Sequence, residues 1–163
     1  MSVCYLDSNF LLSHLRQGER NSDPRFVLWR TAVIQEIGSD RAVVSALVFD
    51  EVVYRSVVSW LKELGDRDPV TTYRRETRDA MQRMRSRLRT LWKAIDALDL
   101  EMKGTDQLVV DRARHLMETE HLGARDACHA AHAIERGCDW IVSADPDFDE
   151  LRDIQRLGPG RIH

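Results

Sequence analysis

Acidic side chains stand close behind two short apolar runs of the sequence. Asp7 follows the run Val3 to Leu6, and Asp145 follows the run Trp140 to Ser143. Such runs predict buried strands, and open parallel sheets bind ligands beyond the carboxyl ends of their strands. Carboxylates gathered there raise one another's pKa, and Mg²⁺ or Mn²⁺ relieves that repulsion with oxygen-preferring coordination. Because such ions activate water and stabilise an in-line displacement at phosphorus, the pattern points to metal-dependent phosphodiester hydrolysis.

Two further carboxylates lie on predicted helix faces that are otherwise apolar or small. Glu51 stands in a row of apolar and aromatic residues at steps of three and four, so its side chain should point toward the interior. Asp126 opens an alanine-rich helix, and the alanines that continue its face imply close packing against the sheet. An unpaired buried carboxylate is costly, so each of the two needs a partner or a cation.

Each of these carboxylates also has an ordinary structural interpretation. Asp7 alone would be a turn residue, Asp126 an N-cap, and Glu51 the partner of an arginine. The acidic stretch 144–150 alone would be a solvated turn. The joint pattern is more specific than any of its members, and we therefore expect one shared metal site.

The elements that would position these carboxylates alternate between strands and helices. The sequence predicts short strands at 3–6, 42–45, 98–102, 140–143 and 154–157. It predicts helices from Phe10 and over 24–37, 47–64, 69–97, 105–120 and 125–136, with a cap at Ser22-Asp23 and a stop at Gly38 before the second strand. This alternation predicts an α/β fold with a mostly parallel sheet and helices on its faces.

Length and composition place few further limits on the function. The 163 residues predict a single domain over 1–163, and the formal net charge of -3 gives no global sign of nucleic-acid binding. No apolar run approaches the roughly 20 residues of a membrane span. The N-terminus lacks a basic stretch followed by an apolar run, which predicts a cytoplasmic protein without membrane association.

Four segments together resemble the PIN domain family. They are Asp7-Ser8-Asn9 after the first strand, Ser45 followed by Glu51, the helix sequence GARDACHAAHA over 123–133, and VSADPDF over 142–148. Their order and separations agree with the family along nearly the whole chain, and the likeness is weakest from about Gly65 to Met102. The subset that the sequence resembles most is the VapC-like toxin ribonucleases of bacterial toxin–antitoxin pairs.

The resemblance implies a three-layer α/β/α fold and metal-dependent cleavage of RNA. It also implies a cognate antitoxin and a homodimer. The ligands of Mg²⁺ or Mn²⁺ that it implies are Asp7, Glu51, Asp126 and Asp145, with Asp147 assisting and with Ser8 and Ser143 orienting the carboxylates. An extra acidic residue, Asp149, leaves the division of roles in the acidic loop open.

Other functions remain open at this stage. A PIN-like module that binds RNA or assembles without catalysis, or a structure-specific DNA nuclease, would share the fold. His129 and His132 follow Asp126 at steps of three, which is compatible with a zinc site, but packing or hydrogen bonding is the favoured interpretation. The absence of an acidic ligand would favour the non-catalytic module, and all of them are present.

A basic segment interrupts this acidic chain. Residues 74–93 carry eight basic and two acidic side chains, a net charge of +6, within a helical arm expected at about 66–97. Such a helix could follow an RNA backbone. It could equally be a solvated face or a surface for the antitoxin. The candidate RNA-binding residues are Arg74, Arg78, Arg85 and Arg89.

Overall fold

Five short parallel strands form the central sheet. The computed structural model describes residues 3–16, 24–37 and 42–159. The strands are β1 (Cys4–Leu6), β2 (Ala42–Ser45), β3 (Glu101–Lys103), β4 (Trp140–Val142) and β5 (Gln155–Leu157). They pair in the order β3-β2-β1-β4-β5, and every neighbouring pair is parallel.

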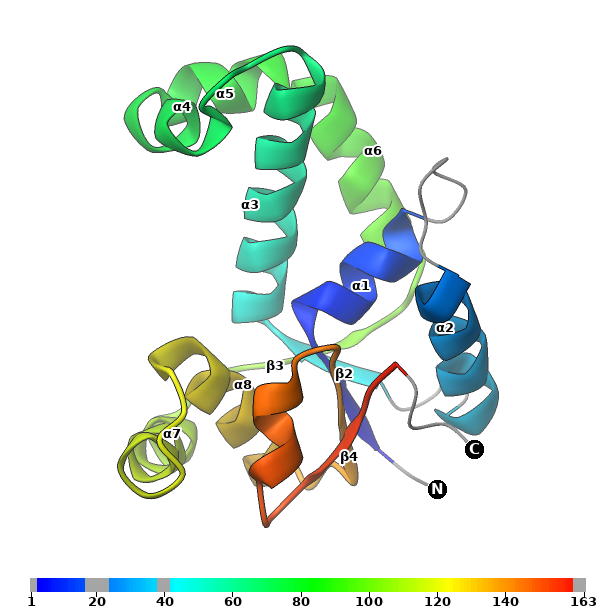
Figure 1. Ribbon diagram of the computed structural model, residues 1–163, viewed down its shortest axis with the longest axis vertical. Helices are drawn as coiled ribbons and strands as arrows, with labels where there is room; N and C mark the ends of the chain where they lie inside the picture. Colours follow the sequence, from blue (N-terminus) through cyan, green and yellow to red (C-terminus); the bar gives the residue numbers. More distant parts are fainter. Residues whose placement is uncertain (1–2, 17–23, 38–41, 160–163) are drawn as a thin grey trace.

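Helices cover both faces of this sheet. They are α1 (Ser8–Leu15), α2 (Pro24–Ile37), α3 (Ala46–Glu63), α4 (Pro69–Arg75), α5 (Thr77–Arg83), α6 (Arg85–Asp96), α7 (Gln107–Thr119) and α8 (Ala124–Glu135), with a short 3₁₀ helix at Pro146–Glu150. Figure 1 shows α7 and α8 on one side of the sheet and α1 and α2 on the other. The expected three-layer α/β/α architecture is confirmed.

The strand order creates a crevice between the carboxyl ends of β1 and β4. From β1 the chain adds β2 and β3 on one side, and it later returns to add β4 and β5 on the other. In open α/β sheets this point of reversal is where ligands bind. The register pairs Leu6 with Val142, and the backbone N–H of Asp7 donates to the carbonyl of Val142 at 3.1 Å. Asp7 and Ser143 therefore leave the sheet side by side.

The core explains why the elements around this crevice are fixed. Tyr5, Val44 and Ile141 from the three central strands are fully buried. The alanines of α8 that face the sheet are buried as well, and their small side chains let this helix approach the strands closely. The sequence prediction of close packing for this helix is confirmed.

The prediction of one long helix over 69–97 is wrong. The segment forms three shorter helices, α4, α5 and α6, which are separated at Glu76 and Met84. Ala80 and Met84 pack with residues of α3 in a second small hydrophobic cluster. These contacts hold the segment where it crosses the far end of α3, and α6 then returns toward the sheet (Figure 1). A single straight helix over 69–97 could not make that return, so tertiary packing overrides the local helix pattern.

Other boundaries shift by a few residues. The third strand lies at 101–103 rather than 98–102, and the helix after it begins at Gln107, with Asp106 instead of Thr105 as its N-cap. The acidic stretch forms the 3₁₀ helix instead of an irregular loop. The predicted cap at Ser22-Asp23 and the stop at Gly38 lie outside the described residues. Within the described ranges, no helix combines the length and the apolar character that a bilayer crossing requires.

Candidate functional site

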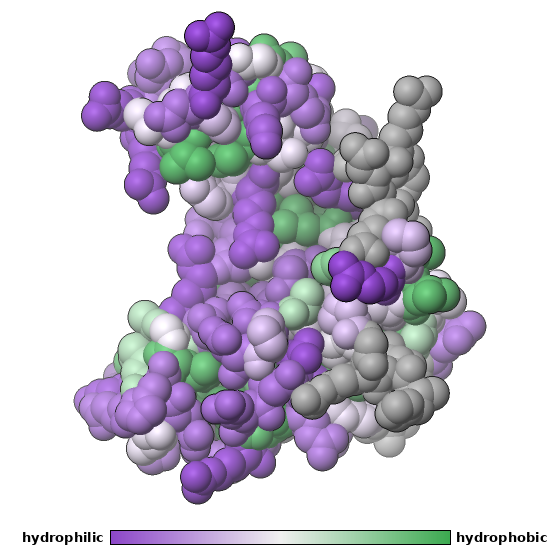
Figure 2. Space-filling view, in the orientation of Figure 1, coloured by the Kyte–Doolittle hydropathy of each residue, from purple (hydrophilic) through white to green (hydrophobic). Residues whose placement is uncertain are grey.

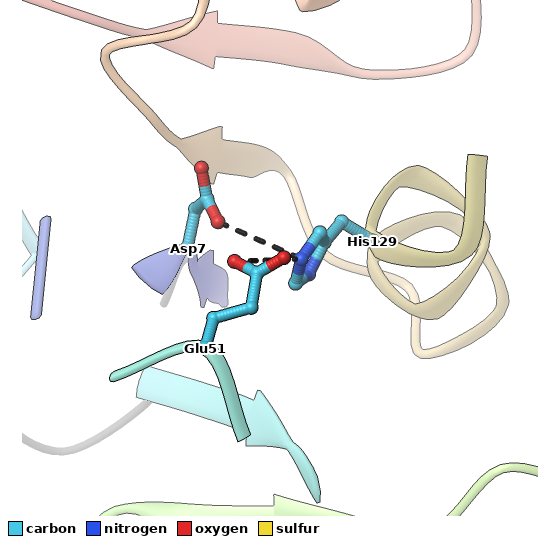
Figure 3. Close-up of side chains that lie close together, drawn as sticks. All are labelled: Asp7, Glu51 and His129. Carbon is cyan, nitrogen blue, oxygen red and sulfur yellow. Dashed lines mark ion pairs between the residues drawn. The ribbon is translucent and has the colours of Figure 1, made fainter. Parts of the chain in front are cut away.

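Three side chains from distant parts of the sequence converge at the crevice. Asp7 comes from the end of β1, Glu51 from the second turn of α3 and His129 from α8, and Figure 3 shows them pointing toward one another. The exposed fractions of Asp7, Glu51 and His129 are 5%, 3% and 1%. One potential ligand atom from each lies within 4.8 Å of the other two.

Hydrogen bonds fix Asp7 across the β1–β4 crevice. Its Oδ2 accepts from the hydroxyl of Ser143 and from the side-chain amide of Asn9, both at 2.6 Å. The carbonyl oxygen of the Asn9 side chain accepts from the backbone N–H of Ala144 at 2.9 Å. Asn9 thus ties the start of α1 to the end of β4 and orients the carboxylate that lies between them.

Glu51 is buried but surrounded by groups that favour its charged form. Ser8 Oγ donates to Glu51 Oε2 at 2.5 Å, and Arg125 Nε lies 3.0 Å from Oε1. Burial raises the pKa of Glu51, but the neighbouring imidazole of His129, this hydroxyl and the guanidinium outweigh it and bring the pKa down to about 2. The carboxylate is therefore ionised at neutral pH.

The remaining predicted carboxylates are more accessible and lie outside the cluster of Asp7, Glu51 and His129. Asp126 and Asp145 are half-buried and Asp147 is exposed. Asp145 caps the 3₁₀ helix by accepting from the backbone N–H of Asp147 at 3.0 Å. Burial and then the charges of Asp145, Asp7 and Asp147 raise the pKa of Asp126, against a smaller opposing effect of His129. Asp126 is thus electrostatically coupled to the other acidic residues, although burial is the larger cause of its raised pKa.

A glycine makes room for Asp126 at the start of α8. A Cβ at Gly123 would lie 3.2 Å from Asp126 Oδ2, which is tighter than nearly all such contacts. The carboxylate therefore folds back toward the helix N-terminus, where the helix dipole favours negative charge.

Asp149 turns away from the other acidic residues. Its two carboxylate oxygens accept from Arg156, at 2.6 Å from Nε and 2.8 Å from Nη2. Its charge is also absent from the causes that raise the pKa of Asp126. Asp149 is thus engaged by Arg156, whereas the division of roles between Asp145 and Asp147 stays a prediction.

Sequence reasoning left His129 out of the site. His129 follows Asp126 by three residues and so shares its helix face, which is the signal that could have placed it there. His132 lies outside the cluster, since its Nε2 is hydrogen-bonded to Thr105 Oγ1 at 2.9 Å. The favoured interpretation of the two histidines, packing or hydrogen bonding, thus agrees with the contacts of His132, and the cluster of potential metal ligands includes His129 but not His132.

The candidate RNA-binding arginines do not share one helix. Arg74 lies in α4, Arg78 in α5, and Arg85 and Arg89 in α6. All four are exposed, and none forms an ion pair with another part of the chain that the structure describes. Figure 2 shows this arm as a mainly hydrophilic lobe, separated from the α7–α8 lobe by a hollow beside α3.

The low pKa of Glu51 gives a prediction about stability. A carboxyl whose folded-state pKa lies below its unfolded value of about 4.3 stabilises the fold above that pH and loses this effect as the pH falls. We therefore expect Glu51→Gln to lower the melting temperature at pH 7, and the difference from the unsubstituted chain to shrink as the pH approaches 2. Thermal unfolding between pH 7 and pH 2 measures it, and a constant difference would contradict it.

A family model described as PIN domain matches residues 4–154. Three solved structures are similar in fold. FitAcB from Neisseria gonorrhoeae has a TM-score of 0.58 at 16% identity, covering 98% of this chain and 99% of that one. VapBC2 from Rickettsia felis, bound to a DNA fragment from its promoter, has 0.51 at 13%, covering 94% and 96%. A toxin–antitoxin complex from Klebsiella pneumoniae has 0.50 at 16%, covering 94% and 97%.

The identities to these structures are low, so the likeness extends to the fold alone. Among curated proteins, none matches the sequence.

Proposed function

This chain belongs to the PIN domain family, whose members are generally nucleases, and we propose that it is a metal-dependent endoribonuclease and the toxin of a type II toxin–antitoxin pair. The observation that carries the proposal is the convergence of Asp7 and Glu51 at the β1–β4 crevice, with Asp126 electrostatically coupled to Asp145, Asp7 and Asp147. The similarity to structures described as toxin–antitoxin complexes supports an antitoxin partner.

The residues present fit a divalent ion. Asp7 and Glu51 would hold Mg²⁺ or Mn²⁺ from the buried side, while Asp126 and Asp145 would complete the site from the accessible side. Asp147, exposed at the edge, would assist through water. Burial raises the pKa of Asp126 most, and the charges of Asp145, Asp7 and Asp147 raise it further, a repulsion that a cation would relieve. When bound, such an ion supplies an activated water and stabilises charge at the phosphate.

The chain itself provides the orientation of these ligands. Ser143 and Asn9 hold Asp7, while Ser8 and Arg125 hold Glu51, so both buried carboxylates are positioned before any ligand binds. Pre-organised ligands of this kind reduce the cost of binding the ion and of aligning the scissile phosphate. Ser8 and Ser143 thus have the orienting role that we propose for them.

Cleavage of matched RNA and DNA tests this function. The purified chain, incubated with Mg²⁺ or Mn²⁺ and an end-labelled single-stranded RNA, should release internal fragments, while DNA of the same sequence stays intact. Asp7→Asn, purified in parallel, serves as the control for contaminating ribonuclease. Cleavage of DNA alone would favour the structure-specific DNA nuclease, and RNA binding without cleavage would favour the non-catalytic module.

We further propose that the arm binds the RNA backbone. Arg85 and Arg89 lie one turn apart on the exposed side of α6, away from the buried Leu91 and Ile95. Removing one phosphate-binding side chain should reduce the salt slope of binding to single-stranded RNA by about 0.7. The double variant Arg85→Gln/Arg89→Gln should therefore bind RNA more weakly and with a slope smaller by about 1.4 if both residues bind phosphates.

Fluorescence anisotropy at several salt concentrations measures this slope. A matched control, Arg114→Gln/Arg152→Gln, removes the same charge from exposed positions of α7 and the C-terminal region, and its slope should not change. Gln retains most of the helix propensity of Arg, so the fold should survive. Equal slopes for the arm variant and the unsubstituted chain would contradict RNA binding, and loss of antitoxin binding would assign the arm to that partner.

Protein partners have candidate surfaces elsewhere on the molecule. Leu28 and Ile34 of α2 are 72% and 48% exposed, and Leu108 of α7 is 64% exposed. Exposed apolar residues of this kind favour protein contacts. We propose that the cognate antitoxin and a second copy of this chain are the partners, and light scattering with and without antitoxin tests the homodimer.

A further inference from the structure

The imidazole of His129 sits where a metal ligand would, beside the two buried carboxylates. We propose that Nε2 of His129 binds the divalent ion together with Asp7 and Glu51, and that this nitrogen ligand makes the site select Mn²⁺ over Mg²⁺. The inference rests on the metal site of the proposed function and adds a ligand and an ion preference to it.

The position of Nε2 is the first argument. This atom is buried, lies 3.5 Å from Glu51 Oε2 and 3.8 Å from Asp7 Oδ1, and has no hydrogen-bond partner among the described residues. A buried polar atom without a partner is costly and rare in proteins. The carboxylate oxygens of Asp7 and Glu51 lie on the same side of the ring, so one ion placed among the three atoms would satisfy all of them (Figure 3).

The other ring nitrogen supplies the second argument. His129 Nδ1 is 2.9 Å from the hydroxyl of Tyr5, which is 2.7 Å from Ser45 Oγ. A metal on Nε2 requires the proton on Nδ1, which then donates to the Tyr5 oxygen while the Tyr5 hydroxyl donates to Ser45. Metal-binding histidines typically have such a partner on the second nitrogen, which fixes the tautomer and the ring.

Ion preference follows from the donor set. Mg²⁺ favours oxygen ligands almost exclusively, whereas imidazole suits the transition metals, and Mn²⁺ accepts carboxylate and imidazole together. Replacing one oxygen ligand of the ion by His129 Nε2 should therefore favour Mn²⁺. The same geometry also fits a His129 that contacts the two carboxylates without binding the ion, and the experiment separates these two roles.

Pulsed electron paramagnetic resonance of the Mn²⁺-loaded chain makes that separation. A directly bound imidazole nitrogen produces electron spin-echo modulation, which must change when histidine is labelled with ¹⁵N. This experiment uses the unsubstituted chain, so it does not depend on whether a variant folds. Absence of a histidine nitrogen coupling at saturating Mn²⁺ would overturn the proposal.

A pair of variants measures the ion preference. His129→Leu should weaken Mn²⁺ binding by about tenfold or more in calorimetry and leave Mg²⁺ binding nearly unchanged. His132→Leu, the same substitution one turn later on α8 and outside the cluster, should retain the Mn²⁺ affinity and the nitrogen coupling. Equal losses of Mn²⁺ and Mg²⁺ affinity in His129→Leu would contradict the selectivity.

The outcomes also separate this inference from the proposed function. A histidine coupling to Mn²⁺ in a chain that cleaves no RNA would uphold the ligand and reject the ribonuclease. RNA cleavage without that coupling would uphold the ribonuclease and reject His129 as a ligand.

Discussion

Asp126→Asn should abolish RNA cleavage and at the same time raise the melting temperature. Loss of a metal ligand removes several kcal/mol of transition-state stabilisation, and at about 1.4 kcal/mol for each factor of ten this is a loss on the order of a thousandfold. Burial and the charges of Asp145, Asp7 and Asp147 raise the pKa of Asp126, so its ionised form destabilises the metal-free fold. The neutral amide removes that cost, with about 2–4 °C expected for each kcal/mol relieved.

The pH dependence of this gain has a definite sign. A carboxyl whose folded-state pKa is raised destabilises the fold above that pKa, and the effect disappears once the pH falls below the unfolded value of about 3.9. The advantage of Asp126→Asn should therefore be full at pH 7 to 8 and vanish near pH 3. Thermal unfolding of the metal-free chain over this range measures it. A variant that cleaves RNA normally would remove Asp126 from the site.

Asp149→Asn is the matched control for this prediction. Asp149 is acidic and belongs to the same region, but both its oxygens are paired with Arg156. Its neutralisation should lower the melting temperature, because the ion pair is removed, and should leave cleavage at saturating RNA within a few-fold of normal. Asp126→Asn should thus lose activity and gain stability, whereas Asp149→Asn should keep most of its activity and lose stability.

Removal of divalent ions should reduce RNA cleavage about as strongly as the substitution Asp126→Asn does. Treatment with EDTA followed by buffer exchange should reduce RNA cleavage on the order of a thousandfold, and added Mn²⁺ or Mg²⁺ should restore it. Binding to the folded state also stabilises it, by about 2.7 kcal/mol at a hundredfold excess over Kd, so the melting temperature should rise with Mn²⁺ concentration. The rise should be strongly reduced in Asp7→Asn.

Two results would contradict the expected requirement for Mg²⁺ or Mn²⁺. Full cleavage after exhaustive chelation would exclude a metal-dependent reaction. Rescue by Zn²⁺ alone would replace the expected hard-ion site by one that prefers nitrogen ligands, with His129 as its first candidate. Treating Asp149→Asn with the same ions provides the control, since its response should equal that of the unsubstituted chain.

The sequence by itself determined the fold class and identified the two carboxylates, Asp7 and Glu51, that the structure brings together. Apolar runs such as Trp140 to Ser143 identified strands, and the face of Glu51 showed that its carboxylate is buried, because periodicity and burial are encoded by near neighbours. Asp7 and Asp145 were predicted as site residues because they follow strands closely in the sequence, and parallel strands end at one edge of the sheet. The resemblance to the PIN domain family rested on the same local segments.

The tertiary structure alone decided the strand order and the side-chain partners. The order β3-β2-β1-β4-β5 places Asp7 beside Ser143, which is 136 residues away, and no local pattern carries that information. The same holds for His129, whose partner Tyr5 is 124 residues distant, and for the breaks at Glu76 and Met84, which follow from packing on α3. Local propensity sets where an element can form, whereas contacts between distant residues determine where it bends and which groups meet.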